Sequence, residues 1–547
     1  MRRSLLVFAL LALGVVPALA QEIDRAAEYR QSAAVLARYP DVPIALDAPA
    51  LKPGRSEFTS QAEMEAFLAA LKARVSALVL GSLGRSQQGR DIPYLLFTQE
   101  GLADPAAVVA LGRPILWFIG LQHGNEPAGG EAMLALCAML ADGDLKPFLD
   151  KVSVVVVPRA NPDGAAAFTR ATASRADLNR DHILLTLPES AALHGKLVEL
   201  PPDVVIDAHE FSVANRWLQK FGVIEASDAM FLYATHPMVH PGVTALADGL
   251  FRSALEGAWQ AHGLKSFWYH TTSYRPNDKL VSMGGNAPGI ARNTFGLMGA
   301  VSFLIETRGV GVGMQGFERR VATHVVAAKA VIAAAAGEAA RLHDAVVAAR
   351  RDTAADRAAL VVAHRLAVGP VELPMLDPKS GADRPTEVPF RDSRAVTPTT
   401  QRARPAGYVL LGEAGAAARR LALNAVAVCA LAVPAAIEAE GFVLKGAIKA
   451  VNRESINPDQ SVEADLAAKS LALPAGALYV PMNQPAAGIV AAALEPDSPG
   501  SFIGTGILAI PPGGREVPIY RVDAAAARTL RLRLVPLPGA PADACGG

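Results

Sequence analysis

His123 and Glu126 stand three residues apart, directly after the apolar run 114–120 (PILWFIG), which predicts a buried strand. The Ala-, Leu- and Met-rich segment 126–140 that follows predicts a helix. One strand end therefore presents an imidazole and a carboxylate together, and such a pair can supply two of the three protein ligands of an open catalytic zinc site. A single H-x-x-E pair is common in proteins, so the residues at other strand ends must decide whether a metal binds.

Three further apolar runs also end in polar residues. The run 152–157 is followed by PRANPDG at 158–164, the run 204–206 by DAHE at 207–210, and the run 300–305 by ETRG at 306–309. In an open α/β sheet, ligands bind at the carboxyl ends of the strands. The pattern therefore predicts one shared site, in which His209 completes a two-histidine, one-carboxylate zinc set.

The overall composition predicts a globular protein with a sizeable core. Of 547 residues, 51% are hydrophobic and 19% are charged, and 52 Lys and Arg balance 52 Asp and Glu. Because this balance leaves no global basic field, we expect no nucleic-acid partner. The length fits three or four domains of ordinary size, or two large ones.

The first twenty residues have the pattern of a signal peptide. Arg2 and Arg3 form a basic start, residues 5–16 an apolar centre and residues 18–20 (ALA) a small-residue cleavage site. We expect an exported protein that is periplasmic or secreted. An uncleaved anchor is the alternative, but the apolar run is short for a bilayer span. We expect no stable membrane anchor after cleavage.

Three cysteines are spread widely along the chain, at Cys137, Cys429 and Cys545. Three such thiols predict neither a disulfide framework nor a thiolate zinc site. Cys137 lies in an apolar helical pattern, so we expect it in the core.

The predicted fold class is α/β, and the chain after residues 1–20 divides into four parts. Residues 21–55 form a lead-in, 56–360 the catalytic domain, 361–405 a Pro-, Asp-, Arg- and Thr-rich linker or the irregular start of a second unit, and 406–547 a smaller accessory module that contains β-strands. We find no catalytic constellation in the accessory module.

Five motifs occur in the order H-x-x-E, N-P-D-G, D-x-N-R, a distant histidine and E-x-R. As a set they resemble the zinc metallocarboxypeptidase family typified by carboxypeptidase A, over roughly residues 59–313. The resemblance implies a three-layer α/β/α domain with a mixed sheet, one zinc ion (Zn2+) and hydrolysis of the C-terminal amide bond of peptides. Peptides of the bacterial cell wall are as plausible as substrates as dietary ones.

The resemblance implies a role for each matched residue near the metal. His123, Glu126 and His209 match the zinc ligands. Glu306 matches the glutamate that acts as general base and then proton donor on a zinc-activated water, a role that needs a carboxylate beside the metal. A structural salt bridge is the alternative for Glu306. Zinc itself is not fixed by the ligand types, because mixed histidine and carboxylate sites accept several metals.

Other matched residues would act beside the metal. Arg170 matches the arginine that stabilises the developing oxyanion, with Arg159 and Arg175 as rivals. Asp177 matches a carboxylate that orients a zinc histidine. Asn179 and Arg180 match the pair that holds the terminal carboxylate of the substrate. A structural ion-pair cluster with Asp181 is the alternative for that pair.

The chain also departs from the family pattern. The family's mobile tyrosine has no clear match, because Tyr269 and Tyr274 lie further back than expected. Asn125 stands where many digestive members have a second substrate arginine. We expect the side-chain pocket to be lined instead by residues of the loop before the last strand, namely Asn286, Arg292 and Asn293.

The sequence thus predicts a zinc metallocarboxypeptidase that acts on peptides. Two alternatives remain open: a related zinc deacylase of N-acyl amino acids, and a catalytically silent binding protein on the same scaffold. Glu306 argues against the silent protein, because a pure binder needs no base at that position.

Overall fold

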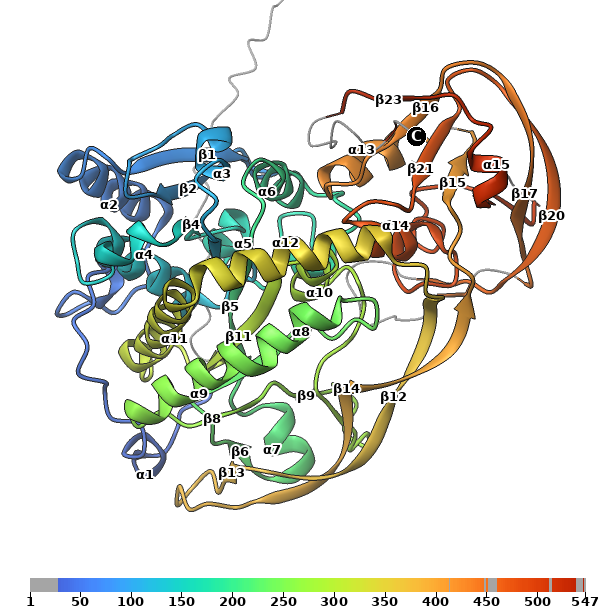
Figure 1. The fold of residues 1–547 in the computed structure, drawn as a ribbon. Helices are drawn as coiled ribbons and strands as arrows, with labels where there is room; N and C mark the ends of the chain where they lie inside the picture. Colours follow the sequence, from blue (N-terminus) through green and yellow to red (C-terminus); the bar gives the residue numbers. More distant parts are fainter. Residues whose placement is uncertain are drawn as a thin grey trace, which may run out of the picture.

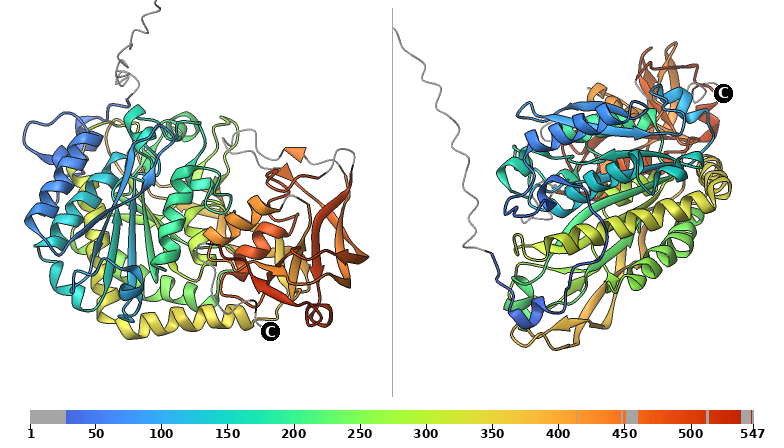
Figure 2. Two further views of the ribbon diagram at one scale, coloured as in Figure 1. Left: turned by 90° about the horizontal axis from the view of Figure 1, so that it is seen from above. Right: turned by 90° about the vertical axis from the view of Figure 1, so that its left-hand side faces the viewer.

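The structure is a computed structural model that describes residues 28–412, 414–446, 449–450, 460–510, 514–537 and 545. The predicted signal peptide, residues 1–20, and the first part of the lead-in lie outside the described residues. A mixed central sheet with helices on both sides stands beside a smaller β-rich module near the C-terminus (Figures 1 and 2). This arrangement confirms the predicted α/β class and the additional β-containing module.

The central sheet has eight strands in the order β1-β2-β4-β3-β5-β11-β7-β8. Their bounds are β1 Val79–Arg85, β2 Asp91–Phe97, β3 Ile115–Gly120, β4 Ser153–Val157, β5 Val204–Ser212, β7 Ala229–Tyr233, β8 Ser266–Trp268 and β11 Val301–Val310. The four middle strands β4, β3, β5 and β11 are parallel. Helices cover both faces of these strands, which explains why their sequences are continuous apolar runs without alternation.

Two groups of helices form the outer layers of the catalytic domain (Figure 2). The first group packs helix on helix and comprises α2 Gln61–Arg74, α4 Pro127–Ala141, α9 Arg252–Ala261 and α11 Phe317–Gly337. The second group includes α6 Pro188–Glu199, which packs on β1, and α10 Ala291–Leu297, which packs on β5 and β11. Among the described residues, α11 alone is long and apolar enough to cross a membrane, but it is mostly buried within this fold.

The remaining helices of this domain are short or lie at its edge. They are α1 Ala33–Leu36, α3 Pro105–Val109, α5 Pro162–Ala167, α7 Arg216–Phe221, α8 Pro241–Leu246 and α12 Ala339–Ala355. Single turns occur at Pro49–Leu51, Lys146–Asp150, Leu178–Arg180 and Ala247–Phe251.

The segment 361–405, which the sequence predicted to be a linker, is folded. It forms most of a long antiparallel hairpin of β12 Leu360–Leu373 and β14 Thr386–Arg402. The hairpin extends a small sheet with β9 Thr271–Thr272 and β10 Val281–Ser282, and it carries β13 Met375–Leu376, which pairs with β6 Ile224–Glu225. Many of its charged residues, such as Arg365, Glu387 and Arg391, are exposed, while alternate residues such as Val388 and Phe390 are buried against the catalytic domain. The linker prediction rested on the amino-acid composition of the segment, which does not reveal this alternation of buried and exposed residues.

The C-terminal module is built on a seven-stranded antiparallel sheet in the order β20-β17-β22-β15-β21-β16-β23. The strands are β15 Gly407–Leu410, β16 Cys429–Leu431, β17 Ala435–Leu444, β20 Ala464–Leu473, β21 Leu478–Pro481, β22 Glu516–Val522 and β23 Leu532–Leu534, with the pair β18 Lys449–Ala450 and β19 Gln460–Ser461. Its helices are α13 Gly415–Leu423, α14 Ala487–Leu494 and α15 Ala524–Ala527. The module shares a hydrophobic core with the catalytic domain, because α13 packs on α6 and α14 on α10.

A disulfide joins Cys429 on β16 to Cys545 near the end of the chain. The wide cysteine spacing had predicted no disulfide framework, and the tertiary fold corrects this by bringing two residues 116 positions apart into contact. Cys137 is free and buried, in agreement with the core position expected for it.

Removal of this disulfide should destabilise the C-terminal module. The change Cys429→Ser is expected to lower its free energy of unfolding by about 2–4 kcal/mol, because the cross-link restricts the unfolded chain. Thermal unfolding with and without a reductant measures this effect. The reductant should destabilise the original protein and leave the variant unchanged; equal stability of the two proteins without reductant would contradict the prediction.

Candidate functional site

The carboxyl ends of β3, β5 and β11 place the predicted metal ligands and base at one edge of the sheet. In the strand register Gly120 pairs with Ala208, and Glu306 pairs with His209. His123 follows three residues after the end of β3, on a tight loop. Gly124 in that loop lies against residues 164–165, and a Cβ there would stand 1.8 Å from the Gly164 carbonyl carbon, so only glycine fits.

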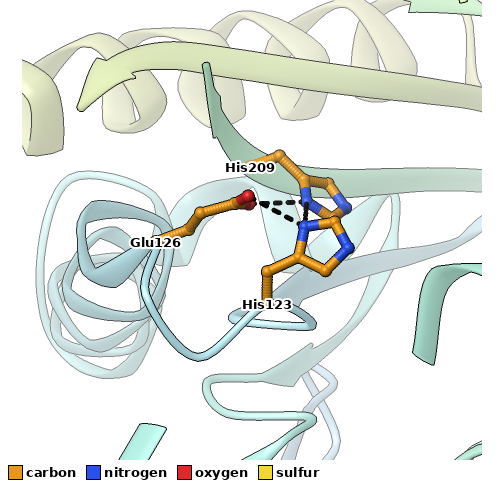
Figure 3. Close-up of side chains that lie close together, drawn as sticks. All are labelled: His123, Glu126 and His209. Carbon is orange, nitrogen blue, oxygen red and sulfur yellow. Dashed lines mark hydrogen bonds and ion pairs between the residues drawn. The ribbon is translucent and has the colours of Figure 1, made fainter. Parts of the chain in front are cut away.

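His123, Glu126 and His209 point toward one another (Figure 3). Glu126 Oε1 lies 2.8 Å from His123 Nδ1, Glu126 Oε2 lies 2.8 Å from His209 Nδ1, and the two Nδ1 atoms are 3.0 Å apart. The three potential ligand atoms lie within 4.8 Å of one another, and all three residues are buried. Two imidazoles and one carboxylate that converge in this way can hold a single zinc ion.

Carboxylates stand behind both histidines. Asp177 Oδ1 lies 3.1 Å from His123 Nε2, the position expected of a carboxylate that orients this ring. Asp207 Oδ2 lies 2.8 Å from His209 Nε2 and was missed by sequence reasoning. Its signal was the D-x-H spacing on β5, because residues i and i+2 of a strand point to the same side. Gln122 fixes the other oxygen of Asp207 at 2.7 Å.

These contacts set the charges within the cluster of His123, Glu126 and His209. Burial acts to raise the pKa of Glu126, but the two adjacent imidazoles hold it well below its ordinary value. Burial acts to lower the pKa of His209, yet Asp207 and Glu126 raise it well above its ordinary value. A cation is therefore favoured between the histidines and the acids, whether it is a proton or a metal ion.

Glu306 faces the same cavity from β11 and is 6% exposed. Burial, with the nearby Glu126 carboxylate second, raises the pKa of Glu306 to about 8, against the opposing effects of His209 and Arg170. A carboxylate in this environment can take up a proton near neutral pH, as a general base must.

Of the three candidate oxyanion arginines, Arg170 is the one at the cavity. Its Nη1 lies 3.1 Å from His123 Nδ1, and its Nη2 is 2.9 Å from Asp177 Oδ2. Arg159 is buried elsewhere and donates to the Thr59 carbonyl, and Arg175 is exposed.

Asn179 and Arg180 both line the cavity, but their side chains differ in how they are engaged. The amide of Asn179 is bonded within the protein, with Nδ2 2.9 Å from His209 Nε2 and Oδ1 accepting from the Ala291 N–H at 2.8 Å. Arg180 donates to the Asn179 carbonyl at 2.7 Å, and no carboxylate of the described residues is ion-paired with it. Arg180 is therefore the member of the pair with free donors.

The loop before β11 does not line the cavity in the way the sequence suggested. Arg292 does line it. Asn286 does not line it. Its Nδ2 donates to the carbonyl of Thr235 (2.6 Å), just after β7, and to that of Ser393 (2.9 Å) on the hairpin. Asn293 is likewise turned inward and bonds the Gly285 and Ala287 carbonyls. Both amides therefore satisfy backbone carbonyls, those of the loop itself for Asn293 and those of neighbouring segments for Asn286.

The fold brings further residues to the cavity that the sequence did not assign. Tyr269 and Tyr274 both line it, although they lie further back in the chain than the family's tyrosine. Leu366 on β12 and Arg391 on β14 reach it from the hairpin. No local motif marks the hairpin residues, because a contact between distant segments brings them there.

The chain is similar to several known proteins. Residues 64–191 match the family described as zinc carboxypeptidase. Carboxypeptidase 2 of Trichophyton rubrum is 28% identical over 484 residues, which cover 86% of this chain and 87% of that protein. Carboxypeptidase SOL1 of Arabidopsis thaliana is 33% identical over 107 residues, covering 19% and 21%. A metallo-carboxypeptidase structure from Burkholderia cenocepacia is 20% identical, covers 55% of this chain and 82% of that chain, and has a TM-score of 0.39.

Residues 64–191 are thus similar to the zinc carboxypeptidase family, and the curated relatives indicate that the chain is a peptidase. This family is zinc-dependent, and the chain carries a convergent His-Glu-His set.

The contact between Asp207 and His209 gives a prediction about metal affinity. Asp207→Asn should weaken zinc binding by about 10–100-fold, because the amide holds the imidazole less firmly and makes it a weaker base. Competition with a chromogenic chelator measures the affinity. Asp181→Asn is the matched control, because Asp181 is equally buried but bonds Thr186, Leu187 and Ser190. This variant should have a lower melting temperature and an unchanged zinc affinity. Equal zinc affinity of the two variants would refute the role of Asp207.

Proposed function

We propose that the protein is an exported zinc metallocarboxypeptidase that releases single residues from the free C-terminus of peptides. The observation that carries the proposal is the convergence of His123, Glu126 and His209 with Glu306 on one cavity. Zinc in this ligand set would polarise the scissile carbonyl and lower the pKa of water.

The chain's own residues supply the other parts of the reaction. Glu306 would accept a proton as water attacks the carbonyl, and would return it to the leaving amine. Arg170, held at the cluster by Asp177, would stabilise the negative charge that develops on the carbonyl oxygen. Arg180 would bind the terminal carboxylate of the substrate, since a guanidinium with free donors suits bidentate recognition.

Export is supported by two independent features. The pattern of residues 1–20 is that of a signal peptide. The disulfide between Cys429 and Cys545 is of a kind that persists in oxidising compartments and is rare in the cytosol.

The proposal predicts metal-dependent release from free C-termini. The mature protein should hydrolyse peptides that end in a carboxylate and leave the same peptides with an amidated terminus intact. Activity should disappear on chelation and return with zinc, and mass spectrometry of the products measures both effects. Cleavage of N-acyl amino acids without cleavage of peptides would indicate the deacylase instead. Zinc binding without either activity would indicate the silent binding protein.

The role of Glu306 gives a second prediction. Glu306→Gln should reduce kcat by at least about 10²-fold while zinc content stays at that of the original protein, because the amide cannot accept the proton. Steady-state kinetics and metal analysis of the same preparation measure the two quantities. A near-native rate would remove Glu306 from the mechanism, and loss of zinc would show that it holds the metal site together.

A further inference from the structure

The cavity beside the metal cluster, about 440 Å³ in volume, is richer in cations than a terminal carboxylate requires. Five arginines line it, whereas its three acids all have other partners or roles. Glu126 belongs to the metal cluster, Glu210 is ion-paired with Arg320 at 2.8 Å, and Glu306 is the proposed base. The cavity wall therefore favours an anionic ligand with more than one charged group.

Arg292 is the one of these five arginines that is buried, so its charge is the least exposed to water. It stands in the first turn of α10 and is 2% exposed. Its Nη2 donates to the Gly285 carbonyl at 2.7 Å, its Nε has no hydrogen-bond partner, and no carboxylate of the described residues forms an ion pair with it. Burial lowers its pKa to about 10, so the guanidinium is still charged at neutral pH.

The surroundings hold this guanidinium at the cavity wall. A Cβ at Gly284 would lie 3.1 Å from Arg292 Nη2 and 3.1 Å from the Tyr269 ring, so glycine allows this close packing. The Ala291 N–H, immediately before Arg292, is bonded to Asn179, the neighbour of Arg180. Two arginines with free donors are thus fixed on one wall, and each can bind a separate carboxylate.

We propose that the site prefers substrates whose C-terminal residue is acidic, with Arg292 binding the side-chain carboxylate of Asp or Glu while Arg180 binds the main-chain carboxylate. The proposal rests on the carboxypeptidase activity proposed above. A buried charge without a counter-ion is unfavourable, and an acidic side chain supplies that counter-ion when it binds. A neutral side chain of the same shape leaves the guanidinium unpaired, and a basic one adds repulsion.

Matched peptides that end in Glu, Gln, Leu or Lys test the preference. The zinc-loaded protein should show a kcat/KM for Glu at least about tenfold above that for Gln, as expected for a charge-assisted hydrogen bond. Arg292→Gln should bring the Glu to Gln ratio close to one, and Arg292→Lys should retain part of it. A ratio near one in the original protein, or a preference for Leu or Lys, would overturn the proposal.

A control variant separates a specific contact from the general field of the cavity. Arg391 on β14 lines the same cavity but is exposed to solvent. Arg391→Gln therefore removes one positive charge from the cavity at an exposed position. The Glu to Gln ratio should persist in this variant. An equal collapse of the ratio in both variants would remove the assignment to Arg292. A uniform loss for all four peptides in Arg292→Gln would instead place Arg292 at the main-chain carboxylate, which also overturns the proposal.

A binding experiment distinguishes failure of this inference from failure of the proposed activity. Calorimetry of free glutamate and free glutamine with the zinc-loaded protein needs no turnover. Tighter binding of glutamate, lost in Arg292→Gln, would support the acidic pocket even if no peptide were cleaved. Equal binding of the two amino acids would refute it even if peptides were cleaved.

Discussion

A carboxylate buried between two imidazoles, Glu126 between His123 and His209, is the contact around which the catalytic domain is arranged. Such a cluster is stable in a low-dielectric interior only if its charges are compensated and its polar atoms are bonded. Asp177 and Asp207 meet this requirement from behind the histidines. The parallel register of β3, β5 and β11 brings all these residues to one level, and the absence of a side chain at Gly124 lets the first loop close against residues 164–165.

Hydrogen bonds of Asn179 also connect the metal-binding residues to the side of the cavity that carries Arg180 and Arg292. Asn179 contacts His209 with its Nδ2 and receives the Ala291 N–H with its Oδ1, so one amide joins β5 to the start of α10. Arg180 and Arg292, to which we assign the two carboxylates of the substrate, follow Asn179 and Ala291 directly in the chain. Movement of the metal-binding residues would therefore also move Arg180 and Arg292. A peptidase benefits from this coupling, because the scissile carbonyl and the terminal carboxylate must be held at a fixed separation.

The C-terminal part of the chain contributes to the cavity as well as to stability. The hairpin of β12 and β14 extends from the module along the catalytic domain (Figure 1), and Leu366 and Arg391 reach the cavity from it. Asn286 bonds the Ser393 carbonyl and so fastens the substrate loop to this hairpin. At the other end, Arg402 of β14 pairs with Glu495 and Asp497 of the module, in an almost fully buried cluster. This pair of strands thus joins the module to the site, in addition to the packing of α14 on α10.

The sequence by itself determined the residues that can do chemistry and the strands that carry them. Apolar runs that end in HGNE, DAHE or ETRG predict where a site lies, because strand ends of a parallel sheet converge. Only the tertiary structure decided which residues from distant segments meet. Asp207 was visible as D-x-H, but its role depends on the position of His209. Asn286 does not line the cavity, because its amide bonds backbone carbonyls of two distant segments, at Thr235 and Ser393. The folded hairpin and the Cys429–Cys545 disulfide depend on contacts across more than a hundred residues, which no local spacing encodes.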